Sequence, residues 1–140
     1  MDSNKVYRGI ARSERGAATG LMSDPDVLQQ YKKFSRLDVI PGTFNIKLTQ
    51  PFDLNLLKYM SAAESGWADF NPADYGLEND GEVGIYYHRI TVADRYPACL
   101  IIPTWAKKPP RSAEIVSPHH LRNVLNLKDG DAVEFTLDKP

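Results

Sequence analysis

Proline and glycine are spread along the whole chain, and this spread limits how long any helix or strand can be. The sequence contains ten prolines and nine glycines, which interrupt it at many points and do not pool into one linker. Six or seven of the intervening segments have the pattern of short strands, and two or three have the pattern of brief helices. Such a succession is typical of a mainly β barrel whose loops carry the functional site.

Size and charge indicate a single globular domain over residues 1–140. A chain of 140 residues buries about two-thirds of the surface that its unfolded form exposes, which is enough for a real core. The formal net charge is only −1, so no general positive field attracts the protein to nucleic acid or to an anionic membrane. Any phosphate ligand must therefore be held by a local site.

Hydropathy predicts neither a membrane span nor an exported chain. No apolar run approaches the ~20 residues that a membrane helix needs, and the polar residues 1–5 do not resemble a signal peptide. We therefore expect no membrane partner, no nucleic-acid partner and a cytoplasmic location. The one cysteine, Cys99, lies in the apolar run 98–102, where a thiol normally packs as a small hydrophobic side chain.

Two segments have helical patterns. Asp24 and Pro25 provide a cap and a first-turn proline, and apolar residues then recur at roughly 3.6-residue spacing. A second helix is expected over residues 53–64. The stretch 66–84 resists a regular assignment, and we interpret it as either a lid over a site or a simple insertion.

Residues 43–48 alternate polar and apolar side chains after a proline-glycine turn, as a half-buried strand does. The apolar side chains expected in the core are Phe44, Ile46 and Leu48. Thr43 and Asn45 share the other face, and their neutral oxygens suit a Mg²⁺ ion that already carries phosphate oxygens. The alternative is an ordinary hairpin start with a polar face.

Two further segments contain candidate anion ligands. Arg12 and Arg15 follow the first expected strand, residues 6–11, and guanidinium groups bind phosphate through charge-assisted hydrogen bonds. That loop lacks the glycine spacing and the lysine of a P-loop, so solvated surface arginines are the alternative. The segment 117–122 places polar donors at a helix start, where backbone N–H groups favour an anion.

The remaining candidates are an acid and the histidines. Glu114 precedes an apolar pair, and its carboxylate would accept a hydroxyl proton from a nearby substrate, or else is an exposed acid at a strand end. His119 and His120 are adjacent and lack the spacing of paired helical metal ligands, so no zinc site is indicated. His88 stands alone in a strand and is expected to be structural.

Two segments resemble one family. Residues 41–48 and 114–134 are similar to the PGTLNVKL and EIIAPxxLRxxLxLKDGDxVE patterns of the archaeal CTP-dependent riboflavin kinases. The resemblance implies a compact six-stranded cradle-loop barrel. It also implies transfer of the terminal phosphate of CTP to a ribityl hydroxyl of riboflavin, with FMN and CDP as products and Mg²⁺ as cofactor.

The resemblance also assigns roles to individual residues. Thr43 and Asn45 match the metal ligands, and Glu114 matches a glutamate on the flavin side, which makes it the candidate general base. Two segments match the nucleotide-binding residues of the family. They are Arg12, Ser13, Glu14, Arg15, Gly16 and Ala17 in the first loop, and His119, His120, Leu121 and Arg122 in the C-terminal turn.

The chain departs from the family at two places. The family has a GxGxG first loop, which residues 12–17 lack, so arginine contacts replace backbone contacts to phosphate or the contact is lost. Ala106 stands where the family has a flavin-contacting threonine, and losing such a hydroxyl costs on the order of 1–3 kcal/mol when its partner stays unpaired. The acceptor is therefore riboflavin or another small alcohol. A non-catalytic nucleotide- or flavin-binding barrel is the remaining alternative.

Overall fold

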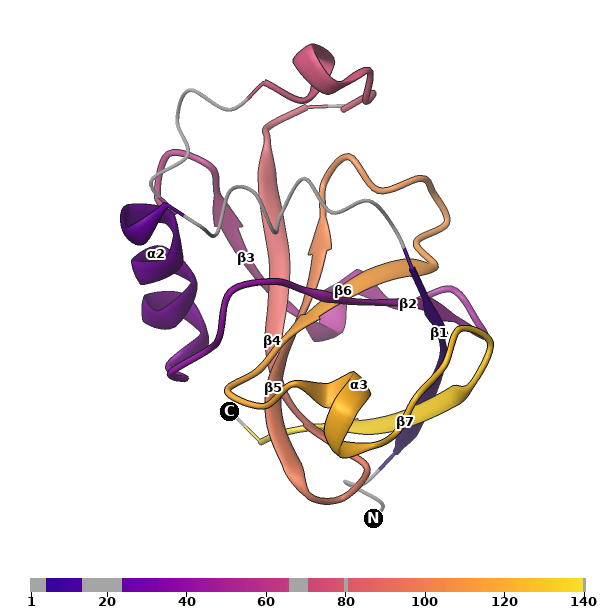
Figure 1. Ribbon diagram of the computed structural model, residues 1–140. Coiled ribbons are helices and arrows are strands. Elements are labelled where there is room, and N and C mark those ends of the chain that lie inside the picture. The colour runs from indigo at the N-terminus through magenta and orange to yellow at the C-terminus, as the bar shows by residue number, and fades with distance from the viewer. Residues whose placement is uncertain (1–4, 14–23, 66–70, 80, 140) are drawn as a thin grey trace.

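The computed structural model describes residues 5–13, 24–65, 71–79 and 81–139. Within these ranges, six antiparallel strands close into a barrel in the order β4-β5-β6-β2-β1-β7, and β7 pairs back onto β4 (Figure 1). The strands are β1 (Val6–Arg12), β2 (Phe44–Leu48), β4 (Gly84–Val92), β5 (Tyr96–Pro103), β6 (Ser112–Val116) and β7 (Ala132–Leu137). The expected mainly β, six-stranded barrel is confirmed.

A seventh strand, β3 (Lys58–Ser61), lies outside the closed barrel. It pairs with the first half of β4, and β7 pairs with the second half of the same β4 edge. The prediction of a helix over residues 53–64 is therefore wrong. Only the 3-10 helix η1 (Leu54–Leu56) forms there, because the unpaired edge of β4 offers hydrogen bonds that outweigh the local helical pattern.

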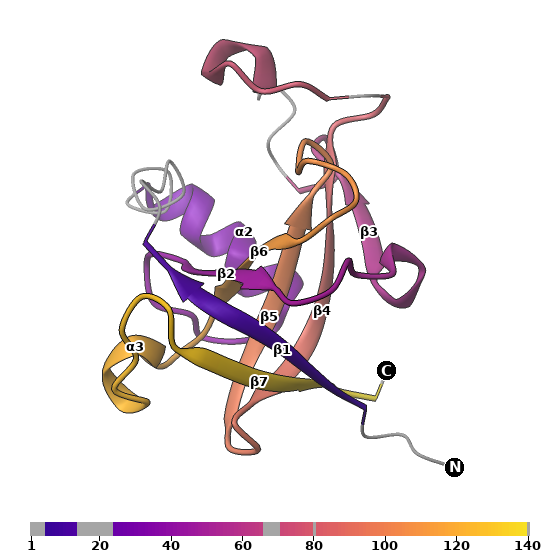
Figure 2. The ribbon, with the colours of Figure 1, turned by 90° about the vertical axis from the view of Figure 1, so that its right-hand side faces the viewer.

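The helix α2 (Pro25–Ser35) covers one flank of the barrel, on the side opposite the wall that faces the viewer in Figure 2. It starts as expected, because the Asp24 side chain accepts a hydrogen bond from the Asp26 N–H at 2.9 Å. Its apolar side packs on the outer face of β4 and β5, around buried Tyr31, Ile85 and Cys99. Burial raises the pKa of the Cys99 thiol to about 12, in keeping with the expected packing role.

Short helices occupy two connections. The segment interpreted as a lid or an insertion contains the 3-10 helix η2 (Pro72–Tyr75) in its described part. The helix α3 (Leu121–Val124) is a single turn between β6 and β7. No helix in the described ranges combines the length and apolar character needed to cross a membrane.

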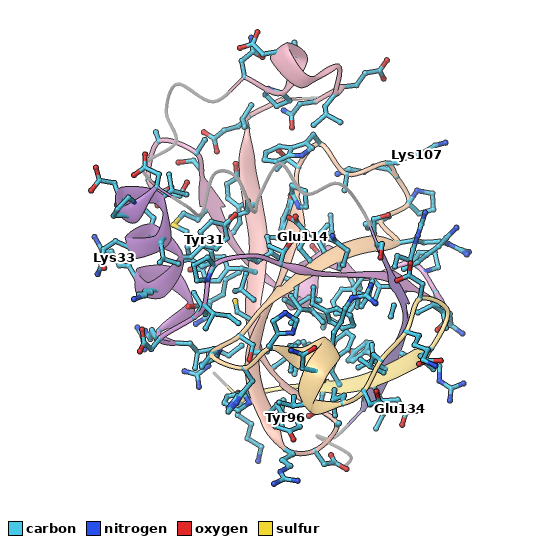
Figure 3. The ribbon with its side chains drawn as sticks, viewed as in Figure 1. Tyr31, Lys33, Tyr96, Lys107, Glu114 and Glu134 are labelled. Carbon is cyan, nitrogen blue, oxygen red and sulfur yellow. The ribbon has the colours of Figure 1, made fainter. Side chains whose placement is uncertain are left out.

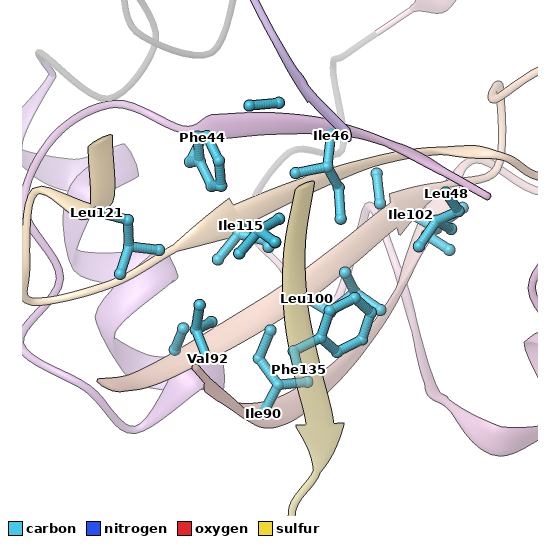
Figure 4. Packing of buried hydrophobic residues seen from close by; sticks show 14 of the residues in the cluster. Phe44, Ile46, Leu48, Ile90, Val92, Leu100, Ile102, Ile115, Leu121 and Phe135 are labelled. Carbon is cyan, nitrogen blue, oxygen red and sulfur yellow. The ribbon is translucent and has the colours of Figure 1, made fainter. Parts of the chain in front are cut away.

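The main core fills the inside of the barrel (Figure 4). Phe44, Ile46 and Leu48 of β2 all belong to it, as the alternation in the sequence predicts. Small inward residues on β1 make room for this packing, because a Cβ atom added at Gly9 would lie 2.7 Å from Ile46 Cδ1. The polar residues of β2 are thereby directed to the outer face of the wall, where the candidate site lies.

Candidate functional site

Strand register places three candidate side chains in one row on the outer face of the barrel wall. Arg12 of β1 is directly opposite Asn45 of β2, and Asn45 is directly opposite Glu114 of β6. Residues paired in this way have Cβ atoms about 4.5–5.5 Å apart and project to the same side of the sheet. Three segments far apart in sequence therefore meet at Asn45.

Thr43, the residue immediately before β2, lies next to this row. Its hydroxyl donates a long hydrogen bond of 3.5 Å to the Glu114 carboxylate, and Asn45 is only 9% exposed. Thr43 and Asn45 thus offer a hydroxyl oxygen and an amide oxygen beside a carboxylate. This donor set suits a hard cation such as Mg²⁺, which binds a few protein oxygens and completes its shell with phosphate or water.

A cavity of about 270 Å³ opens where β2 begins and β6 ends. Its volume is close to the lower limit of about 300 Å³ for small-molecule pockets. It brings Thr43 together with the predicted nucleotide turn. The lining residues are Ile40, Pro41, Gly42, Thr43, Phe44, Ile115, Ser117, His119, His120, Leu121 and Arg122.

The turn that follows β6 is fixed by a buried hydroxyl. Ser117 Oγ donates to the Pro97 carbonyl at 2.8 Å and accepts from the His119 N–H at 3.1 Å. His119 and His120 are exposed at the cavity, whereas the Leu121 side chain is buried in the main core. Leu121 therefore offers little side-chain surface to a ligand.

Arg122 is held on two sides at the edge of the cavity. Its Nη2 atom lies 2.7 Å from Asp129 Oδ1, and its guanidinium carbon lies 5.5 Å from the centre of the Phe44 ring. The same Asp129 oxygen accepts a hydrogen bond of 2.9 Å from the Ser13 hydroxyl. The hydrogen bonds from Ser13 and Arg122 lower the pKa of Asp129.

Helix α2 brings Tyr31 within electrostatic range of Glu114. Tyr31 lies on the barrel side of α2 and Lys33 on its solvent side, and Glu114 lies on the barrel side of Tyr31 (Figure 3). Burial raises the pKa of Tyr31, and the nearby Glu114 carboxylate raises it further. Glu114 therefore lies at the boundary between the polar row and the apolar surface that α2 covers.

Ala106 is not brought into this cluster, and one group of predicted residues falls outside the described part of the chain. Ala106 lies in the β5–β6 connection, where its N–H donates to the Pro103 carbonyl at 3.0 Å and its side chain packs on the main core. Glu14, Arg15, Gly16 and Ala17 lie outside the described residues.

Sequence reasoning missed Asp129 and Tyr31 as neighbours of the site. The local sequence indicates only a turn at Asp129, before the last strand, and only an apolar helix position at Tyr31. Both assignments are correct for the backbone. The Asp129–Arg122 contact spans a seven-residue separation, and the effect of Glu114 on Tyr31 depends on how distant segments pack; no local pattern records either.

The fold and the site define a class: a closed antiparallel barrel that carries on its wall a polar row and a cavity suited to an anionic ligand. Comparisons with known proteins narrow this class. A family model for CTP-dependent riboflavin kinases, described as "Domain of unknown function DUF120", matches residues 13–137. The chain belongs to this riboflavin kinase family of phosphotransferases.

Three relatives named riboflavin kinase illustrate the range of similarity. The proteins of Pyrococcus furiosus and Pyrococcus abyssi are 30% and 45% identical over 140 residues, which is 95% of this chain and 60% of each relative. The protein of Sulfurisphaera tokodaii is 25% identical over 128 residues, and the match covers 91% of both chains. The chain thus spans about 60% of the length of the two Pyrococcus relatives.

Proposed function

We propose that this protein transfers the terminal phosphoryl group of CTP to a ribityl hydroxyl of riboflavin in the cytoplasm, giving FMN and CDP. One observation carries the proposal. The cavity joins Thr43 to the turn of residues 119–122, and Thr43 also contacts Glu114 beside Asn45. A phosphate chain, a cation and an acceptor hydroxyl would therefore share one small region.

The chemistry asks for positioning and charge neutralisation more than for covalent help from the protein. In the proposal, His119, His120 and Arg122 contact the nucleotide from one side of the cavity. Thr43 and Asn45 hold Mg²⁺ through their neutral oxygens. The bound ion would offset the negative charge of the phosphate oxygens.

Glu114 is the proposed general base. Its carboxylate accepts the proton of the acceptor hydroxyl while the hydroxyl oxygen forms a bond to the γ-phosphorus. The bond from the γ-phosphorus to the bridging oxygen breaks, and CDP leaves with the electron pair. The Thr43 hydroxyl, 3.5 Å from Glu114 Oε1, helps to orient the carboxylate.

In this proposal, Arg12 replaces some of the phosphate contacts that the glycine-rich loop of the family provides through its backbone. Its register position opposite Asn45 places it on the same face as the proposed metal ligands. A guanidinium there adds positive charge and hydrogen-bond donors next to the phosphate chain. We therefore propose Arg12 and Ser13 as the described part of the nucleotide-binding first loop.

The direct test is a mixture of the protein, CTP, Mg²⁺ and riboflavin, analysed for FMN and CDP by chromatography. The expected result is equal amounts of both products, with no product when Mg²⁺ is removed by a chelator. Absence of transfer from CTP and from the other nucleoside triphosphates would overturn the kinase proposal.

Asn45→Ala separates catalysis from simple binding. Loss of a proposed metal ligand should lower kcat by about 100-fold, a typical cost of removing one group that stabilises charge in the transition state. Binding of riboflavin should change much less. A non-catalytic binding barrel would instead show no turnover in the unchanged protein and little effect of this substitution.

Ala106 favours a second candidate, a CTP-dependent kinase of a different alcohol. The methyl side chain cannot supply the hydrogen bond that the threonine of the family gives to flavin. A screen of small alcohols for CDP release distinguishes the two candidates. Faster turnover of another acceptor than of riboflavin would replace the first proposal with the second.

A further inference from the structure

We propose that Asp129 is a positioning residue of the nucleotide site, where one carboxylate oxygen holds Arg122 and Ser13 together. The inference rests on the proposed nucleotide binding by these two residues. Asp129 is itself outside the cavity lining, so it acts through its two neighbours.

The first half of the argument is the confinement of Arg122. An arginine side chain has many rotamers, and holding it in one of them costs entropy when a ligand binds. Here Asp129 contacts one guanidinium nitrogen at 2.7 Å, and the guanidinium also lies over the Phe44 ring. Arg122 and Thr43 line the same cavity, so these contacts fix Arg122 in the region of the proposed metal ligand before any nucleotide arrives.

The second half is the link to the first loop. Ser13 is the first residue after β1, and its hydroxyl donates to the same Asp129 Oδ1 atom at 2.9 Å. The backbone supports this contact, because the Gly130 N–H donates to the Ala11 carbonyl at 2.9 Å and the Ala11 N–H donates to the Asp131 carbonyl at 2.8 Å. The end of β1 and the turn before β7 therefore form one fixed unit, and Asp129 connects it to Arg122.

Stability alone gives little reason for this arrangement. The side chains of Arg122 and Asp129 are 27% and 56% exposed. Exposed ion pairs of this kind contribute only about 0–1 kcal/mol to folding. Holding the guanidinium in place lowers the entropy cost of binding an anion, and this benefit to binding explains the contact better than its small contribution to folding stability.

Charge makes the proposal easy to refute. Asp129 places a negative charge near the proposed phosphate site, where it repels the ligand. If Asp129 had no positioning role, its replacement by Asn would leave nucleotide affinity unchanged or increase it. Positioning predicts the opposite sign.

The experiment measures the Kd of CDP by calorimetry for the unchanged protein and for Asp129→Asn, together with the thermal unfolding temperature. We expect Asp129→Asn to weaken CDP binding by about threefold to tenfold, a moderate change on the affinity scale. Ser13→Ala should give a smaller loss. In an Arg122→Ala background, the effect of Asp129→Asn should shrink, because the two changes remove the same interaction.

Glu134→Gln is the matched control. Glu134 forms an ion pair with Arg8 at 3.8 Å, its side chain is 57% exposed, and it lies on β7 away from Glu114 (Figure 3). This control removes one acid from a similar exposed pair outside the site, so CDP binding should stay within about twofold of the unchanged protein.

The outcomes separate this inference from the kinase proposal. CDP affinity of Asp129→Asn equal to or higher than that of the unchanged protein overturns the role of Asp129. If the unchanged protein binds CDP but forms no FMN, the kinase proposal fails while the role of Asp129 is still decided by the affinities. If the unchanged protein binds no CDP, both proposals fail.

Discussion

Two outer faces of the same barrel follow the same strand alternation but have opposite character. On β4 and β5, the outward side chains of Ile85, Cys99 and Ile101 are at most 2% exposed, because α2 packs over them. On β1, β2 and β6, the outward row is Arg12, Asn45 and Glu114. Alternation decides only which residues point outward, and the covering element decides whether that face becomes a core or a candidate site.

Glu114 lies where the two faces meet. In β6 it is opposite Asn45 on one side and opposite the buried Ile101 on the other. One neighbour is a polar candidate ligand and the other belongs to the apolar cluster beneath α2. A carboxylate at this boundary is partly shielded from water on one side and adjoins the polar row on the other, which is compatible with the role proposed for it.

The largest expected effect comes from changing Glu114 on the polar side. Glu114→Gln should lower kcat by about 100- to 10,000-fold, because the amide cannot take up the proton of the substrate hydroxyl. The free energy of unfolding should change little, since the amide keeps the shape of the carboxylate. Steady-state kinetics with CTP and riboflavin measure the first quantity, and urea unfolding measures the second. A variant that keeps more than about a tenth of the kcat would remove Glu114 as the base.

Ile85→Ala tests the apolar side of the comparison. Ile85 is 1% exposed beneath α2, so its truncation should lower the free energy of unfolding by about 2–5 kcal/mol. Ile85→Val should cost only about 0.5–1.5 kcal/mol. In both variants, the KM for CTP should equal that of the unchanged protein when the assay is run well below their unfolding temperatures. A large change in KM with normal stability would show that the two faces are not separate in function.

Ala106→Thr sharpens the comparison by testing whether the polar row alone decides the acceptor. A hydroxyl restored in the β5–β6 connection should lower the KM for riboflavin by about fivefold to tenfold, corresponding to about 1–1.4 kcal/mol from one hydrogen bond. The KM for CTP should not change. Ala106→Ser adds the hydroxyl with less bulk, and Ala106→Val is the control that adds bulk without a hydroxyl. An equal improvement with Val would assign the effect to packing.

The smallest expected effect is the contribution of Cys99, on the apolar side, to the pH dependence of the free energy of unfolding. Its folded-state pKa, about 12, lies above the ordinary thiol value, so the unfolded chain loses its proton first as pH rises. The contribution to stability is therefore complete below the ordinary value and is lost as pH rises toward about 12. Between about pH 8 and about pH 10, the free energy of unfolding should fall by about 1 kcal/mol more than in Cys99→Ala. Parallel curves for the two proteins would contradict this account.

The sequence predicted much of the fold because its strongest signals are local. Asp24 and Pro25 marked the start of α2, and the alternation around Phe44 and Ile46 identified the inward face of β2. The helix predicted over residues 53–64 failed where pairing of β3 with β4 prevailed over local preference. No local signal reports the presence of an unpaired strand edge elsewhere in the chain.

The candidate site was predictable in its residue types and only partly in its arrangement. The matching segments identified Thr43, Asn45 and Glu114, but their roles stay predictions until activity is measured. The contact of Asp129 with Ser13 and Arg122 joins residues 116 and 7 positions apart. The first contact follows from the pairing of β1 with β7 and the second from the shape of the turn between α3 and β7, and a linear pattern contains neither.

By itself, the amino-acid sequence determined most of the short elements, the inward and outward faces of β2 and the family to which the chain belongs, but not β3. Tertiary structure alone decided that Arg12, Asn45 and Glu114 form one row and that α2 covers the face next to it. The physical reason is that side-chain direction is set by backbone geometry within a strand, whereas neighbours across strands are set by hydrogen-bond register between distant segments.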